Sequence, residues 1–292
     1  MSSPPDDLIR PFQIEGVGVR GRLVRLGPAL DQILRRHDYP DLVANLLGEA
    51  VALSCVLAGA LKFDGIFTLQ TKGDGPISTL VADFKSPGAL RGYAQFDADA
   101  VANIDTATAP SIPRLQGAGH IAFTVEGHSV ADCAHNYFRE SEQIETAIAL
   151  ACTKTADDGP WRGGAIMLQR LPEGDPSLLA RGVEVERDEV SEDDWRRVVT
   201  MLASAKDSEL TDPALPGDDL LYRLFHEDGV RIFEPTALQP GCRCSNGRVE
   251  RILQQLPEAE LPDLAVDNQL IVTCEFCNAS YTFALEQFIT AS

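Results

Sequence analysis

Basic side chains are scarce in this chain. Its 292 residues include 25 Lys and Arg against 44 Asp and Glu, which leaves a formal net charge of −19 at pH 7. Proteins that bind DNA or RNA need a basic surface to face the phosphates, so the charge excludes nucleic acid as the main partner. Acidic side chains outnumber basic ones more than two to one between residues 173 and 235. Self-repulsion should make that segment marginally stable.

Long apolar runs are also missing. The longest uncharged apolar run, from residue 50 to residue 61, is shorter than the roughly 20 residues that a membrane-spanning helix needs. The N-terminus reads Met-Ser-Ser-Pro-Pro-Asp-Asp, which is polar and acidic where a secretory signal is basic and then apolar. We therefore expect a cytoplasmic protein with no membrane partner.

The sequence lacks the motifs of common enzyme classes. Neither a Gly-x-Ser-x-Gly elbow nor a His-Glu-x-x-His helix occurs in it. Gly16 to Gly21 satisfies the G-x-G-x-x-G spacing of a dinucleotide site, but the following residues alternate as in a strand instead of opening a helix. The Gly-Asp-Gly turn at residues 72–76 lacks the Gly-Lys-Ser/Thr that holds phosphate. We expect no ATP site and no enzymatic activity.

Cysteine is sparse, and most of it is concentrated near the C-terminus. Cys242 and Cys244 form a Cys-x-Cys pair, and after 29 intervening residues Cys274 and Cys277 form a Cys-x-x-Cys pair. Two such pairs suit a tetrahedral sulfur site, because each supplies two neighbouring corners from one tight turn. Zinc is the metal we expect, since structural zinc takes four soft ligands and leaves no position open.

The four thiols allow two interpretations. Most four-cysteine sites are structural, so the spacing alone favours a permanently reduced zinc module. Clustered thiolates are also the form of cysteine that oxidants attack, and a disulfide within either pair would close a small, strained and reducible ring. The other three cysteines lie apart, and we expect Cys55, Cys133 and Cys152 to be buried, inert thiols.

Apolar spacing predicts an α/β (α+β) domain with a largely antiparallel sheet in the N-terminal half. A short helix is expected over residues 28–36, and a longer, nearly all-apolar one from Asp41 to Leu61 should be the core helix. A further helix is expected over residues 129–140. Turn residues separate short β-rich runs, which is typical of antiparallel strands. The expected strands cover residues 12–26, 66–71, 77–84, 90–96, 121–125, 144–152 and 164–171.

Strand signals stop after residue 171. A capping sequence at residues 191–194 predicts one helix, and apolar spacing predicts a second over residues 218–226. Helices this short need a surface to dock on. Docked core is the simple interpretation, and a conditionally exposed surface for unfolding proteins is the functional one. The candidate client-binding residues are Trp195, Leu202, Leu221 and Phe225.

Several stretches together match one known pattern. They are Cys242-Arg-Cys244, Cys274-Glu-Phe-Cys277, the segment from Leu224 to Pro235 with its Phe-Glu-Pro ending, Ser141-Glu-Gln143, Gly163-Gly164 and Lys72-Gly-Asp-Gly-Pro76. On these residues, and over essentially its whole length, the chain resembles the Hsp33 family of redox-regulated chaperones. Glu145 departs from the pattern, because the family usually places proline there.

The resemblance implies three parts and a redox mechanism. The parts are an N-terminal α/β domain over residues 1–171, an acidic helical linker over residues 172–240 and a C-terminal zinc domain over residues 241–292. Reduced protein would hold zinc through all four paired cysteines and be inactive. Oxidants would form the disulfides Cys242–Cys244 and Cys274–Cys277, release the zinc and free the linker.

The linker would then hold unfolding client proteins without ATP, and the resemblance implies a homodimer when the protein is oxidised. Two alternatives stay open. One is a structural zinc module for protein interaction. The other is a thiol-disulfide oxidoreductase, although Cys274 and Cys277 lack the flanking βαβ pattern typical of that class.

Overall fold

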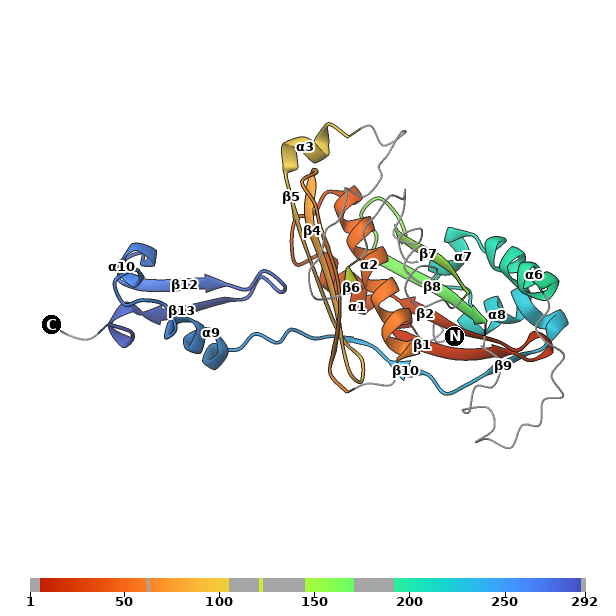
Figure 1. Cartoon of the computed structure of the whole chain (residues 1–292). Helices are drawn as coiled ribbons and strands as arrows, with labels where there is room; N and C mark the ends of the chain where they lie inside the picture. Colours follow the sequence, from red (N-terminus) through yellow and green to blue (C-terminus); the bar gives the residue numbers. More distant parts are fainter. Residues whose placement is uncertain (1–5, 62–63, 105–120, 123–144, 171–191, 290–292) are drawn as a thin grey trace. The chain divides into compact units, whose positions relative to one another are not determined.

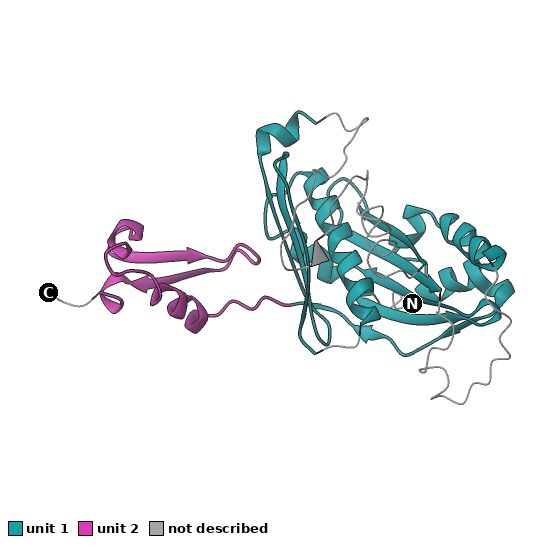
Figure 2. Cartoon of the chain, in the orientation of Figure 1, with its two compact units in different colours: residues 1–240 teal, residues 241–292 magenta. Residues whose placement is uncertain are grey.

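The computed structural model describes residues 6–61, 64–104, 121–122, 145–170 and 192–289. Contacts divide the chain into two compact units, residues 1–240 and residues 241–292 (Figure 2). The helix expected over residues 129–140, Cys133 and most of the strand expected over residues 121–125 lie outside the described residues. The separation of a domain ending at residue 171 from a linker stays a prediction.

The first unit contains a sheet with the strand order β10-β1-β2-β8-β7, in which β9 also pairs with β1. All recorded pairings in this sheet are antiparallel. The two short strands β9 and β10 come from the segment expected to be a linker, so part of that segment is built into the sheet edge. The strands are β1 (Leu8–Ile14), β2 (Val19–Leu26), β7 (Thr146–Lys154), β8 (Trp161–Arg170), β9 (Val230–Ile232) and β10 (Thr236–Ala237).

A tight hairpin occupies the region where the sequence predicts one strand over residues 12–26. The short 3-10 turn η1 (Glu15–Val17) joins β1 to β2, and Gly18 after it has a φ of 61°. Glycine adopts this left-handed conformation at no steric cost. The prediction of a single strand is wrong. The chain reverses direction between residue 15 and Gly18, while the alternation of apolar residues continues through the turn. The glycine motif therefore lies in a hairpin and is followed by a strand.

The second sheet of this unit has the order β11-β5-β4-β3-β6. Its centre is the predicted antiparallel meander, and the turn at residues 72–76 joins β3 to β4 as expected. The outer strands pair in parallel with their neighbours, so the sheet is largely antiparallel. The strands are β3 (Ile66–Lys72), β4 (Ile77–Lys85), β5 (Ala89–Phe96), β6 (Ile121–Ala122) and β11 (Gln239–Pro240).

The helix α2 (Asp41–Ala60) contacts strands of both sheets, as Figure 1 shows. With α1 (Pro28–Leu34) it forms the main core, while α3 (Ala98–Ala102) follows β5.

By length and composition alone α2 could cross a membrane, but 78% of its apolar window is buried within the unit. Cys55 and Cys152 are both buried in this core, which confirms their predicted placement.

A second core lies on the other face of the β10-β1-β2-β8-β7 sheet. Alternate residues of a strand point to opposite faces, and Val24 joins the α2 core whereas Leu23 joins this second one. Its cover is formed by α6 (Glu192–Ala203), α7 (Asp207–Thr211) and α8 (Gly217–Phe225), followed by the short turn η3 (His226–Asp228). The helices α6 and α8 were predicted, whereas α7 was not.

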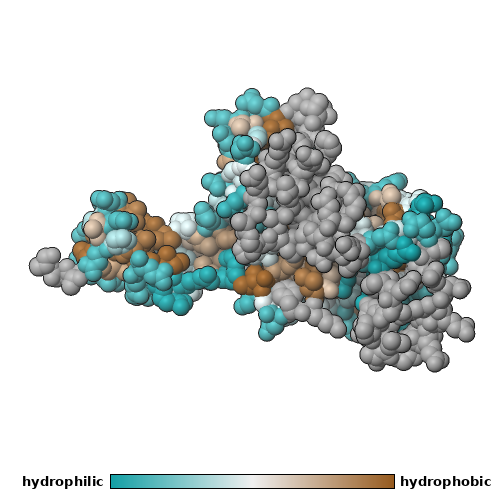
Figure 3. Space-filling model, viewed as in Figure 1, coloured by the Kyte–Doolittle hydropathy of each residue, from teal (hydrophilic) through white to brown (hydrophobic). Residues whose placement is uncertain are grey.

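The second unit is small. It contains α9 (Asn246–Leu253), α10 (Leu261–Leu264), β12 (Gln269–Thr273), β13 (Ser280–Ala284) and the short turn η4 (Leu285–Gln287). Figure 3 shows apolar surface on this unit, and its exposed large apolar side chains are Ile252, Leu264, Val266 and Ile271. A core this small needs another source of stability, such as a metal. Its buried apolar side chains are Val249, Leu253, Leu261, Leu270, Phe283 and Leu285.

Candidate metal centre

The Cys274-x-x-Cys277 pair lies in the turn between β12 and β13. The amide of Cys274 donates to the carbonyl of Ala279 at 2.9 Å, and the amide of Asn278 donates to the carbonyl of Cys274 at 2.8 Å. Asn278 has a φ of 57°, a left-handed conformation that asparagine tolerates better than most residues. The backbone of this turn thus directs both thiols to one side.

The Cys242-x-Cys244 pair precedes α9. Ser245 is the N-cap of that helix, and its hydroxyl accepts a hydrogen bond from the amide of Arg248 at 3.3 Å. A capped helix start has defined backbone geometry, so it fixes the residue immediately before it. Cys244 is the residue immediately before this N-cap, so its backbone leads directly into the start of α9.

The four sulfur atoms form one compact cluster and all lie within 4.8 Å of one another. Cys242 Sγ is 3.6 Å from Cys274 Sγ, and Cys244 Sγ is 3.3 Å from Cys277 Sγ. A zinc tetrahedron with metal–sulfur bonds of about 2.3 Å has edges of about 3.8 Å. The arrangement therefore fits a four-sulfur metal site with only small movements of the thiols.

The pKa values of the thiols also favour binding of a cation by the cluster. Burial raises the pKa of the Cys242 thiol, but the backbone amide of Cys244 and the neighbouring thiols outweigh it and lower the pKa to about 7. Burial and the three neighbouring thiols raise the pKa of Cys277 to about 12. One thiolate forms readily and opposes ionisation of the others. A divalent cation removes that penalty, because it attracts every thiolate.

A tyrosine hydroxyl also reaches the cluster. Tyr281 Oη donates a hydrogen bond to Cys244 Sγ at 3.0 Å. Tyr281 is the second residue of β13, lies opposite Val272 in the hairpin and packs against the core of the second unit. The sequence analysis missed this residue, because nothing in the spacing of the motif links positions 37 residues apart.

Comparison with known proteins identifies the family. The sequence profile of the Hsp33 protein family matches residues 7–284 of the chain. The chain belongs to the Hsp33 family. The resemblance noted in the sequence is thereby confirmed, and membership of the Hsp33 family supports a chaperone function.

Relatives of the Hsp33 family match over almost their whole length. The 33 kDa chaperonin of Caulobacter vibrioides (strain NA1000 / CB15N) is 38% identical over 295 residues, which cover 94% of each chain. The 33 kDa chaperonin of Escherichia coli O7:K1 is 31% identical and covers 96% of this chain and 93% of its own. These relatives are bacterial, and their names describe chaperonins rather than enzymes.

A solved structure supports the fold. The crystal structure of the 33 kDa chaperonin (heat shock protein 33 homolog) from Thermotoga maritima superposes with a TM-score of 0.75. It covers 97% of both chains at 20% sequence identity. The Hsp33 fold, a mixed α/β architecture, is thus the fold of this chain, and the cysteine cluster in its C-terminal region is consistent with a zinc-binding domain.

The predicted client-binding residues all lie in the second core of the first unit. Trp195 and Leu202 of α6 and Leu221 and Phe225 of α8 are buried there. Phe225 stacks on Phe12 of β1, with 5.8 Å between ring centroids. In this state the four side chains are docked core, so a role in binding clients requires the helices to leave the sheet.

Buried arginines of β2 and β8 hold the C-terminal end of α7, and no sequence pattern predicted these contacts. Arg25 donates to the carbonyls of Glu209 and Asp212, and Arg162 donates to the carbonyl of Thr211 at 2.7 Å. Backbone carbonyls occur at every residue, so such partners leave no sequence pattern.

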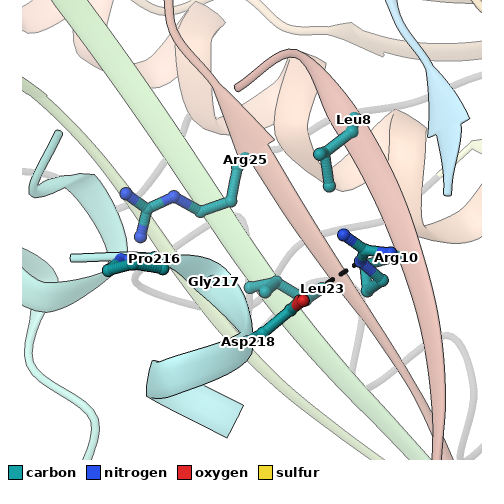
Figure 4. A pocket seen from close by; sticks show the side chains of 7 residues that line it. All are labelled: Leu8, Arg10, Leu23, Arg25, Pro216, Gly217 and Asp218. Atoms are coloured by element: carbon teal, nitrogen blue, oxygen red, sulfur yellow. Dashed lines mark ion pairs between the residues drawn. The ribbon is translucent and has the colours of Figure 1, made fainter. Parts of the chain in front are cut away.

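The start of α8 meets the same sheet face. Figure 4 shows Arg10 and Arg25 beside Pro216, Gly217 and Asp218, around a small cavity of about 40 Å³. The Arg10 guanidinium pairs with the Asp218 carboxylate at 3.2 Å. Three arginines of the sheet, Arg10, Arg25 and Arg162, therefore contact the end of α7 or the start of α8.

Proposed function

We propose that this protein is a redox-regulated holdase chaperone that works without ATP. The observation that carries the proposal is the cluster of four thiols within 4.8 Å in a unit with a very small core. Cys242, Cys244, Cys274 and Cys277 would hold zinc in the reduced, inactive protein. Zinc would supply a structural cross-link between the hairpin and the start of α9.

Oxidation would act on the thiolates themselves. One thiolate attacks hydrogen peroxide, the O–O bond breaks, and a sulfenic acid and hydroxide form. The second thiolate of the same pair displaces the hydroxyl group from that sulfenic acid, which makes the S–S bond. Two protons convert the two hydroxides to water, so two thiolates, one peroxide and two protons give one disulfide and two waters. We propose the pairs Cys242–Cys244 and Cys274–Cys277.

Loss of the metal would unfold the second unit. A structural zinc contributes on the order of 10 kcal/mol to the folding of a small domain. A disulfide that closes a ring of only one or two intervening residues replaces little of this stabilisation, because the effect of a cross-link falls as its loop shrinks. The acidic linker, which ends at residue 240 immediately before the cysteines, would then lose its structured neighbour.

The client-binding surface would come from the acidic linker, residues 172–240. Once α6 and α8 leave the sheet, their apolar faces can contact unfolding proteins, and the acidic side chains keep the complex soluble. We propose Trp195, Leu202, Leu221 and Phe225 as contact residues. We also propose that the protein acts in the bacterial cytoplasm and dimerises when it is oxidised.

One experiment tests the proposal. Bound zinc, free thiols and suppression of client aggregation are measured on the full chain before and after peroxide treatment at mildly raised temperature. We expect zinc release, loss of four thiols and a gain of aggregation suppression to occur together. Equal suppression in both states, or zinc retained in the active state, would contradict the holdase. Turnover of an external disulfide would favour an oxidoreductase, and zinc that survives peroxide would favour a structural module.

A further inference from the structure

We propose that Tyr281 is a positioning residue of the thiol cluster, whose hydroxyl holds the Cys244 sulfur at its corner and slows its oxidation. This inference rests on the proposed function, because it concerns how readily the same cluster loses its metal. The observation behind it is the hydrogen bond from Tyr281 Oη to Cys244 Sγ at 3.0 Å.

The tyrosine ring is fixed independently of the cysteines. Tyr281 pairs with Val272 across the β12–β13 hairpin, and its ring packs on the core that contains Leu270 and Phe283. The hydroxyl is therefore delivered to one point in space by the hairpin. A donor that is held in place before the metal binds reduces the cost of ordering its acceptor.

The bond also joins two separate segments. Cys244 lies before α9, whereas Tyr281 lies in β13 after the second cysteine pair. The hydroxyl thus tethers the Cys242-x-Cys244 segment to the hairpin that carries Cys274 and Cys277. Partners of this kind orient metal ligands, and their removal typically lowers metal affinity by about 10- to 100-fold.

The hydroxyl changes the chemistry of the sulfur as well. A hydrogen bond to a thiolate withdraws electron density from the lone pair that would attack peroxide. Hydrogen bonds to charged acceptors are the strong ones in proteins, and four thiolates around one divalent cation carry excess negative charge. We therefore expect the bound state to be stabilised and the attack on peroxide to be slowed by the same contact.

The test compares two variants of the full-length, metal-loaded chain. Tyr281→Phe keeps the ring and removes the hydroxyl. Ser280→Ala is the matched control, because it removes the neighbouring hydroxyl, which contacts Thr273 Oγ1 at 3.1 Å and lies at the same hairpin. Any general loosening of the hairpin should appear in both variants, whereas an effect on the sulfur should appear only in Tyr281→Phe.

Three readouts separate positioning from packing. The first is the thiolate-to-metal charge-transfer band of the cobalt-substituted protein, which we expect to move to lower energy in Tyr281→Phe and to stay in place in Ser280→Ala. Misfolded molecules that bind no cobalt lower the amplitude of this band without moving it. The second is the rate of zinc release under hydrogen peroxide, followed with a chromophoric chelator, which we expect to rise several-fold. Zinc affinity by competition should fall about 10-fold.

The outcomes distinguish this inference from the proposed function. If wild-type protein releases zinc under peroxide and Tyr281→Phe matches it in band position and release rate, the role of Tyr281 is refuted and the holdase stands. If wild-type protein keeps its zinc under peroxide, the holdase is refuted, and the cobalt band and the zinc affinity still decide the role of Tyr281. A shift of equal size in Ser280→Ala would assign the effect to the hairpin and refute the specific contact.

Discussion

The two regions that a redox switch must connect are stabilised in different ways. Among its described residues, 241–289, the second unit buries six apolar side chains and brings four thiols together. The helices α6, α7 and α8 instead cover a full sheet face, where they bury large side chains such as Trp195 and Phe225 and accept hydrogen bonds from arginines of the sheet. We therefore expect the second unit to depend on a metal held by its four thiols, whereas α6, α7 and α8 depend on the sheet.

This difference shows where a trigger can act. On the proposed function, loss of the metal would remove most of the stability of the second unit, but it would remove no contact between Phe225 and Phe12 or between Arg162 and Thr211. Burial of a large apolar side chain contributes about 1.5–3 kcal/mol. The docked segment should therefore need a further destabilisation, such as heat, before it leaves the sheet. Each region can then be tested by a change that leaves the other intact.

Removal of the metal or of one ligand should have the largest effect. Cys274→Ser leaves three thiols in the cluster and should abolish tight zinc binding. The loss of zinc should cost the second unit on the order of 10 kcal/mol of folding free energy. Chelation of zinc from the wild-type chain should do the same. NMR spectra or limited proteolysis should show residues 241–292 unfolded while the first unit stays protected.

Gly247→Ala is the control for this change. Nothing lies within 4 Å of a Cβ added at Gly247 in α9, so the variant should retain zinc and a folded second unit. If the second unit of Cys274→Ser stays protected without metal, its small core is sufficient to keep it folded. The proposed difference between a metal-stabilised second unit and sheet-stabilised helices would then be wrong.

Truncation of Phe225 should loosen the helical segment with the metal still bound. Its side chain is fully buried against Phe12, and the loss of a buried phenylalanine costs about 3–5 kcal/mol. Phe225→Ala should speed hydrogen exchange in α6 and α8 without releasing zinc. Tyr222→Ala on the same helix is the control, since Tyr222 is 64% exposed and should change stability little. Equal exchange in the two variants would overturn the assignment of α8 to the sheet.

The two regions should also respond to pH in opposite directions. Burial and the nearby Asp207 carboxylate raise the pKa of Glu49 to about 7. Because the folded pKa is raised, the contribution of Glu49 to the stability of the first unit is fully present below about pH 4.5 and is lost as pH rises through about 7. A metal–thiolate site behaves inversely, because protons compete with the metal for sulfur as pH falls.

Glu49→Gln tests this opposition. The variant should gain up to about 3 kcal/mol over wild type at pH 8 and gain nothing at pH 4, because a shift of one pKa unit corresponds to about 1.4 kcal/mol. Thermal unfolding of the first unit across that range measures the difference. Asp157→Asn, at an exposed site, should leave the pH profile unchanged. A profile for Glu49→Gln parallel to that of wild type would remove Glu49 as the cause.

The sequence predicts the parts whose signal is local. The apolar run of α2, the β3-β4-β5 meander and the cysteine pairs each show a period or spacing within a short window. The β1–β2 reversal was missed because Gly16 and Gly18 fit a strand alternation as well as a turn. The contacts of Arg25 and Arg162 were missed because their partners are backbone carbonyls, and Tyr281 was missed because it meets Cys244 only through the fold.

The smallest expected effect comes from the buried arginine of β8. Arg162 Nε donates to the carbonyl of Thr211 at 2.7 Å, and its terminal nitrogen pairs with Asp6 at 2.7 Å. Arg162→Met keeps the apolar stem but removes the donor to the Thr211 carbonyl and the closer of the two arginines that pair with Asp6, which should cost about 2 kcal/mol.

The control for Arg162→Met is Arg196→Met, because Arg196 pairs with Asp193 on an exposed face of α6, where such pairs contribute under about 1 kcal/mol. The expected result is faster hydrogen exchange around residues 209–218 in Arg162→Met only, with zinc content unchanged in both variants. Loss of zinc in Arg162→Met would mean that the sheet and the metal act on one cooperative unit, and the two regions would no longer be separable.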